Sequence, residues 1–139
     1  MVLAMFFIVV MRYVFDWGSI AFQESVTYMH ALVLMLGVAY TLKHGGHVRV
    51  DIFYRQAPER TQGWVDSFGI IFLLLPTCAF ILWVSWDYVA ASWSLREASR
   101  EAGGLPIVYL LKSLMLLAAL LLLLQSIAEL SKAWSKAKP

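Results

Sequence analysis

The stretch SFGIIFLLLPTCAFILWVSW, residues 67–86, decides the fold class, because its 20 residues carry no charge between Asp66 and Asp87. A helix rises about 1.5 Å per residue, so this run can cross the ~30 Å hydrocarbon core of a bilayer. Pro76 stands midway along it, and membrane helices tolerate proline where neighbouring groups satisfy the freed carbonyl. The sequence therefore predicts a long transmembrane helix over residues 64–93 that is kinked at Pro76.

Three further apolar blocks on either side of this run predict transmembrane helices over residues 1–15, 24–42 and 106–128. The first block would rise only about 22 Å as a helix, which suggests that its cytoplasmic start is missing. The second has no Asp, Glu, Lys or Arg between Glu24 and Lys43. All four blocks together predict an all-α integral membrane protein with four transmembrane helices.

The composition agrees with a membrane protein. Hydrophobic residues make up 61% of the 139 residues and charged residues 14%, whereas soluble domains have about 45–50% and about 25%. We therefore expect a single membrane domain, residues 1–139. Cys78 is the only cysteine, so no intramolecular disulfide can form, and the lack of a basic cluster with interleaved aromatics argues against nucleic-acid binding.

The placement of Lys and Arg predicts the orientation. With four crossings, the loop at residues 43–63 and the C-terminal tail lie on one side and hold four and three Lys or Arg residues. The other side has Arg12, Arg96 and Arg100. Because cytoplasmic loops are enriched in Lys and Arg, both termini are expected in the cytoplasm.

Two local features refine this picture. Alternation of apolar and charged residues over 48–52 suggests a short extended piece inside the 43–63 loop. Tryptophan is enriched at the two surfaces of a bilayer, and the predicted interface anchors are Trp17, Trp64, Trp83, Trp86, Trp93 and Trp134.

Few residues could carry chemistry. His30 is the only histidine inside an expected crossing, while His44 and His47 form either a weak metal-binding pair or a solvated one. Every Asp and Glu lies near a block boundary, so the deep carboxylate expected of a proton-driven carrier is missing. No phosphate loop or nucleophile elbow is present. We therefore predict no enzyme activity, no bound cofactor and no metal site.

Three charged residues near helix ends leave alternatives open. Lys112 lies near the interior of the last block, where its stem can snorkel to the outer surface or its ammonium can pair with an acid on a partner helix. Arg12 and Glu24 are expected at the outer ends of adjacent crossings. They could form a structural ion pair that holds the hairpin, or part of a substrate site.

An ordered set of short motifs resembles a known family. The motifs are Arg12-Tyr13, Trp17, Glu24, Gly37, His47-Val48-Arg49-Val50-Asp51, Pro58, Ser94-Leu95-Arg96-Glu97-Ala98-Ser99, Gly103-Gly104-Leu105-Pro106 and Tyr109-Leu110-Leu111-Lys112-Ser113. Their order over nearly the whole chain, together with four expected crossings and a small size, is similar to the small membrane subunit (small permease, DctQ-like) of tripartite ATP-independent periplasmic (TRAP) transporters.

This resemblance implies a non-catalytic scaffold subunit in a bacterial or archaeal cytoplasmic membrane. A large membrane subunit (DctM-like) would carry the substrate and sodium sites and move as an elevator. A periplasmic solute-binding protein (DctP-like) would deliver an organic acid. The candidate contacts with these partners are Arg12, Glu24, His47, Arg49, Asp51, Arg96, Glu97, Arg100 and Lys112. Arg49, together with Lys43, could instead contact anionic membrane lipids.

Two other function classes stay open at this point. A self-sufficient, homo-oligomeric membrane transporter would need a polar or charged stripe along one helix, which the placement of acids argues against. A redox membrane subunit would need ligands that converge on haem or quinone, and a visible absorption spectrum would test the haem version.

Overall fold

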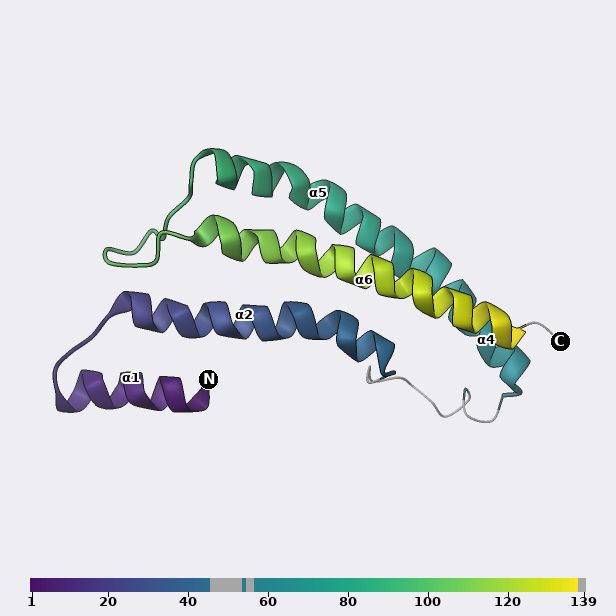
Figure 1. The fold of residues 1–139 in the computed structure, drawn as a ribbon, viewed down its shortest axis with the longest axis horizontal. Helices are drawn as coiled ribbons and strands as arrows, with labels where there is room; N and C mark the ends of the chain where they lie inside the picture. The colour runs from purple at the N-terminus through teal and green to yellow at the C-terminus, as the bar shows by residue number, and fades with distance from the viewer. Residues whose placement is uncertain (46–53, 55–56, 138–139) are drawn as a thin grey trace.

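The computed structural model describes residues 1–45, 54 and 57–137, and most of these residues are helical (Figure 1). The elements are α1 (Val2–Val14), α2 (Ile20–Lys43), α4 (Glu59–Gly69), the π-helical segment η1 (Ile70–Leu74), α5 (Leu75–Ser94) and α6 (Val108–Ala137). The described residues contain no strand, which confirms the all-helical prediction for that part of the chain. The extended piece expected over 48–52 lies outside the described residues.

Three helices are long and apolar enough to cross a membrane. They are Ile20–Lys43, the continuous run Glu59–Ser94 and Val108–Lys136. The first helix, α1, is apolar but has only 13 residues and rises about 20 Å, less than the hydrocarbon core. A fourth crossing by α1 therefore stays a prediction.

The ends of three helices differ by more than one residue from the sequence-based expectation. Helix α2 begins at Ile20 instead of residue 24. The third helix begins at Glu59 instead of residue 64, because Pro58 stands just before it with φ −60° and an acidic residue opens its first turn. The last helix begins two residues after Pro106 and continues to Ala137, past the expected end at residue 128. Its polar final turns stay helical because Ala133 is still buried against neighbouring helices.

The π-helical segment η1 ends at Leu74, two residues before Pro76 in the longest helix. Proline has no backbone N–H, so the carbonyl of Phe72, four residues earlier, has no donor from position 76. Irregular turns of this kind commonly accompany proline in membrane helices. The kink itself stays a prediction.

Helix α6 is the centre of the bundle. It packs against α4 and α5 on one side and against α2 on another, while α1 lies beside α2 at the edge of the molecule (Figure 1). Among the described elements, α1 makes its substantial contacts only with α2. The N-terminal helix is therefore the least enclosed part of the fold.

Small side chains are buried on both α5 and α6. Those that recur every seven residues are Cys78, Ser85 and Ser92 on α5 and Ala119, Ser126 and Ala133 on α6, the helix that packs against α2, α4 and α5. Small residues let helix backbones approach closely, which drives association where no hydrophobic effect acts between helices. Ser126 is fully buried, and its hydroxyl donates to the carbonyl of Leu122 at 2.6 Å, so no polar hydrogen is left without a partner there.

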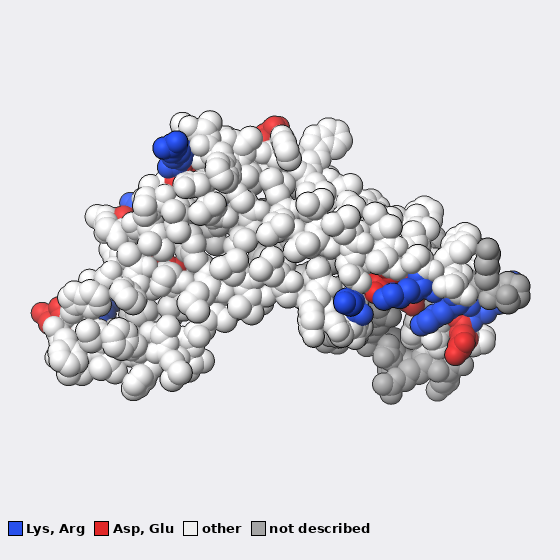
Figure 2. Space-filling view, in the orientation of Figure 1, with Lys and Arg blue, Asp and Glu red and all other residues white. Residues whose placement is uncertain are grey.

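The outer faces of the bundle are apolar. Leu3 and Trp83 are 83% and 80% exposed, and many other large apolar side chains are exposed with them. Figure 2 shows Lys, Arg, Asp and Glu mainly at the two ends of the molecule, with a broad uncharged belt between them. Such a belt suits lipid or another apolar helix, because it would be costly in water.

Candidate functional site

Polar contacts gather at the two ends of the bundle. We call the end formed by residues 15–19 and 95–107 the hairpin end, and the end formed by the C-terminal turns of α2 and α6 with the start of α4 the basic end (Figure 1). The sequence-predicted site residues divide between these ends. His47, Arg49 and Asp51 lie outside the described residues.

Glu24, in the first turns of α2, holds the 95–107 segment at the hairpin end. Its Oε1 accepts a hydrogen bond from the hydroxyl of Ser99, and its Oε2 accepts one from the backbone N–H of Leu105 at 2.6 Å. The N–H of Ser99 donates to the carbonyl of Leu105 at 3.0 Å, which closes the segment on itself. One carboxylate thus connects two parts of the chain that are far apart in sequence.

Gly104 is required by this arrangement. A Cβ built at that position would overlap the side chain of Ser99 and lie 2.8 Å from Oε1 of Glu24. Its neighbour Gly103 has φ +81°, a left-handed conformation that favours glycine. The glycine pair therefore lets the segment turn tightly against the carboxylate.

A second carboxylate, Glu97, connects the same segment to α6. Lys112 forms an ion pair with Oε2 of Glu97, and the hydroxyl of Ser92 donates to that oxygen at 2.8 Å. The ammonium of Lys112 also lies 4.0 Å from the centroid of the Tyr88 ring. The hydrogen bond from Lys112, and then that from Ser92, holds the pKa of Glu97 below its usual value.

These contacts change the interpretation of the charged residues. Lys112 finds its acid within the same chain, a possibility that the sequence reasoning did not consider. Glu24 gives its two oxygens to Ser99 and Leu105 and makes no ion pair with Arg12 within the described structure. Arg12 and Glu24 instead line a common pocket of about 670 Å³ together with Asp16.

The remaining site candidates of the hairpin end point outward. Arg96 and Arg100 are exposed, and Arg96 has φ +46°, which is uncommon for a residue with a side chain. Arg100 is close enough to favour the charged form of Glu97. These two arginines are the cationic side chains that this loop leaves accessible.

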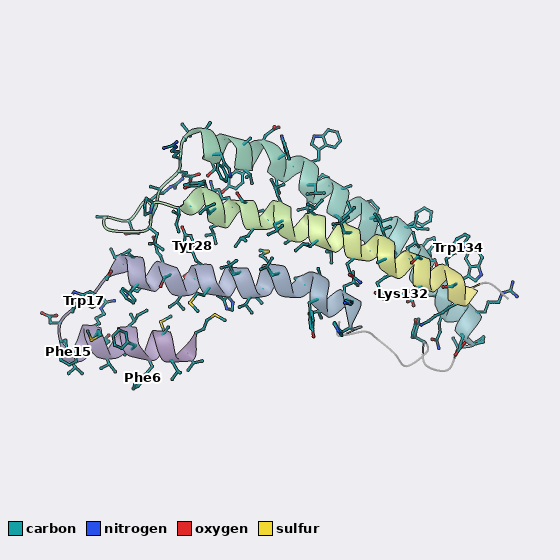
Figure 3. The ribbon with its side chains drawn as sticks, in the orientation of Figure 1. Phe6, Phe15, Trp17, Tyr28, Lys132 and Trp134 are labelled. Carbon is teal, nitrogen blue, oxygen red and sulfur yellow. The ribbon has the colours of Figure 1, made fainter. Side chains whose placement is uncertain are left out.

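The aromatic residues mark both ends. At the hairpin end, the indole N–H of Trp93 donates to Ser113 at 2.7 Å, and Trp17 contacts Phe22 edge-on (Figure 3). At the basic end, the rings of Trp64 and Trp134 lie 6.0 Å apart. Trp83 and Trp86 are exposed along α5. The role of these residues as interface anchors stays a prediction.

Sequence reasoning did not assign functions to Ser92, Ser99, Tyr88 and Gly104, although they complete the two carboxylate clusters. The sequence does contain a signal for two of these residues. Ser99 and Gly104 fall within the polar motifs of residues 94–106, where hydroxyl and glycine residues stand beside acids. The sequence does not indicate that Glu24 pairs with Ser99, because no periodicity connects α2 with the 94–106 segment.

The basic end carries a different network. The hydroxyl of Tyr54 donates to Asp66 at 2.5 Å, and Lys132 pairs with Glu129 at 2.7 Å. An open groove of about 540 Å³ lies beside these residues. No group of three or more His, Cys, Asp or Glu that could hold a metal ion occurs in the described ranges.

Comparison with known protein families gives a match over nearly the whole chain. A family model described as "Tripartite ATP-independent periplasmic transporters, DctQ component" matches residues 1–136. No curated protein sequence and no solved structure matches the chain. The family match agrees with the resemblance that the ordered sequence motifs indicate.

Proposed function

Since the chain belongs to the DctQ family, the small membrane component of tripartite ATP-independent periplasmic transporters, we propose that it braces the large membrane subunit in the bilayer. Its three long apolar helices make it a multi-pass protein of the inner membrane. The large subunit would carry the organic acid and sodium, and a periplasmic solute-binding protein would deliver the acid. The chain itself would be non-catalytic and would cross the bilayer four times, with both termini in the cytoplasm.

The observation that carries this proposal is the separation of charged ends from an apolar belt (Figure 2). A solute carrier needs polar groups near the bilayer centre, where they are expensive and therefore functional. A brace needs rigid helices with apolar outer faces. The described carboxylates instead lie near helix ends, and Glu24 and Glu97 at the hairpin end hold the chain's own loop.

Helix α1 and the outer face of α2 supply candidate surfaces for the large subunit. Phe6 is 67% exposed and Val33 is 60% exposed, and neither is covered by another described helix. Within a membrane, such faces associate through packing and lipid displacement rather than through a hydrophobic effect. Arg12 borders this surface at the hairpin end.

The hairpin end is the proposed docking surface for the binding protein. Glu24, Glu97 and Lys112 shape the segment from inside, whereas Arg96 and Arg100 are exposed on it. Docking would therefore use the two arginines to meet acidic side chains. His47, Arg49 and Asp51 are proposed to support the cytoplasmic edge of the subunit interface.

The test is reconstitution of transport from separate components. Vesicles that hold the large subunit and this chain, supplied with the binding protein and a sodium gradient, should take up substrate. Omitting this chain should abolish uptake, and this chain alone should show none. Sodium-driven uptake by this chain alone, or a haem absorption band in the purified protein, would contradict the proposal.

A charge reversal separates the two roles of the hairpin end. The double variant R96E/R100E should raise the concentration of binding protein needed for half-maximal uptake by about tenfold, and it should still co-purify with the large subunit. Arg60→Glu, at the basic end, is the matched control and should leave that concentration unchanged. An equal effect of both variants would indicate a general charge effect instead of docking.

A further inference from the structure

The basic end contains a groove where three parts of the bundle converge. Its volume is about 540 Å³, and its lining comes from the end of α2, from α4 with η1, and from the last turns of α6. Lys132, labelled in Figure 3, lies on the α6 side of it. The groove is open on one side, and its two walls differ in chemistry.

One wall is cationic. Lys43 comes from the end of α2, and Lys132 and Lys136 come from α6, where a spacing of four residues puts them on one face. Glu129 is already engaged by Lys132 at 2.7 Å and by Gln125 at 2.9 Å. Within the described structure neither Lys43 nor Lys136 makes an ion pair. Two ammonium groups therefore face the groove with their charge uncompensated by a salt bridge.

The other acid of the lining is also engaged. Asp66 accepts a hydrogen bond from the hydroxyl of Tyr54 at 2.5 Å. Three lysines thus line the groove against two carboxylates, each of which has a donor of its own. The electrostatic preference of the groove is for an anion.

The opposite wall is apolar and reaches deep into the bundle. Val65, Ile70 and Leu74 line it along α4 and η1, and the rise from Val65 to Leu74 corresponds to about 14 Å of helix. Gly69 lies between them, and a Cβ added there would meet no atom within 4 Å. The wall therefore has room for an alkyl chain next to the backbone.

The aromatic pair of this end places the lysines at headgroup depth. Trp64 and Trp134 are 55% and 50% exposed, with their rings 6.0 Å apart, and Trp134 stands between Lys132 and Lys136 on α6. Trp concentrates at the level of the lipid headgroups. A ligand whose anion meets the lysines would extend its remaining part toward the hydrocarbon core.

We propose that this groove binds one acidic phospholipid, with its phosphate at Lys43 and Lys136 and an acyl chain along Ile70 and Leu74. Basic pockets between membrane helices on the cytoplasmic side are suited to anionic headgroups. The apolar wall distinguishes a lipid from a soluble phosphate compound, which would leave that wall in water. This site does not depend on the transporter role proposed above, since it requires only that the chain lies in a membrane.

The test measures lipid retention by native mass spectrometry on the full chain, extracted from membranes and titrated with phosphatidylglycerol or phosphatidylcholine of equal chain length. The wild type should retain one phosphatidylglycerol in preference to phosphatidylcholine. Each lysine removed should weaken binding about fivefold, so the double variant K43Q/K136Q should bind about 25-fold more weakly. Gly69→Leu should also weaken binding, because it fills the apolar wall without changing any charge.

Arg60→Gln is the matched control, because it removes a positive charge from the same end but not from the groove lining. It should leave the affinity unchanged. If Arg60→Gln weakens binding as much as Lys43→Gln does, the attraction is a diffuse surface effect and the proposal is wrong. Equal displacement of the lipid by glycerol 3-phosphate would assign the groove to a soluble anion and would likewise overturn it.

Discussion

Two glutamates at the hairpin end illustrate how single residues set the shape of a connecting segment. Glu24 accepts from a hydroxyl and a backbone N–H of the segment, and Glu97 accepts from Ser92 and Lys112 on the flanking helices. Hydrogen bonds to charged groups are about twice as strong as those between neutral groups. Both carboxylates therefore hold the segment in place through hydrogen bonds, and neither is presented to solvent as a free charge.

The environment of Gly104 gives the first prediction. Gly104→Ala should destabilise the protein by about 1–3 kcal/mol, because the new methyl group would push Ser99 away from Glu24. Thermal unfolding in detergent measures the change. Gly37→Ala is the control, since a Cβ there meets nothing within 4 Å and alanine favours the helix. Equal stability of both variants would show that the segment is not tightly held.

The lowered pKa of Glu97 predicts a pH dependence. Because the pKa is lower in the folded state than in the unfolded chain, the stabilisation is fully present above the unfolded value, about pH 4.3, and is lost as the pH falls through the folded value. Glu97→Gln should therefore lower the melting temperature at neutral pH, and the difference from the wild type should shrink as the pH falls below about 4.3. Glu101→Gln, in the same loop, should be neutral throughout. A constant difference between wild type and Glu97→Gln at every pH would contradict this assignment.

The sequence indicates that these residues are important more clearly than it indicates their partners. Their polarity next to apolar blocks singles out Glu24, Glu97 and Lys112 as costly positions near a membrane. Pairing Glu24 with Ser99 and Leu105 requires knowing that α2 lies beside the 95–107 segment, and that contact joins residues more than 70 positions apart. No local pattern encodes it.

At the scale of elements, the helices follow from hydrophobic length, but their ends follow from local capping. The apolar blocks predict the central part of each described helix. They do not predict the start at Glu59 or the continuation to Ala137, because these turns are charged, and amphipathic turns at a bilayer surface stay helical when one side is buried.

The small residues buried on α6 give an element-scale prediction. Ser126→Leu should destabilise the bundle by about 1–3 kcal/mol or more, because Ser126 is fully buried where the helices approach closely. Unfolding in a denaturing detergent measures it. Ile127→Leu is the control, as Ile127 is 51% exposed and keeps its volume. Unchanged stability of Ser126→Leu would mean that the helices packed around Ser126 can move apart at little cost.

At the scale of the whole molecule, the unequal distribution of Lys and Arg between the two ends predicts an orientation. The basic end is expected in the cytoplasm and the hairpin end outside. The native Cys78 has no exposed surface, so introduced cysteines can be labelled against a silent background. Ala102→Cys should react with an impermeant maleimide on intact cells, and Ser135→Cys should react only after permeabilisation. The reverse pattern would invert the proposed topology.

A reporter fused ahead of Met1 tests the fourth crossing in the same cells. If α1 crosses the bilayer, the reporter should be cytoplasmic, on the same side as Ser135→Cys. A reporter outside the cell would show that α1 lies on the outer surface and does not cross. This outcome bears on the 13-residue length of α1, which the structure leaves shorter than a typical crossing.

The central place of α6 has a consequence for biogenesis. The ribosome delivers α6 after every other described helix, yet α6 supplies the principal contacts of α2, α4 and α5 in the bundle. Until α6 emerges, α2 and the helix formed by α4, η1 and α5 lack the helix that both pack against, while α1 already has its partner α2. The bundle can therefore assemble only after α6 has been synthesised. A translation product that stalls before α6 would expose helices that have inserted but have not assembled to quality-control proteases.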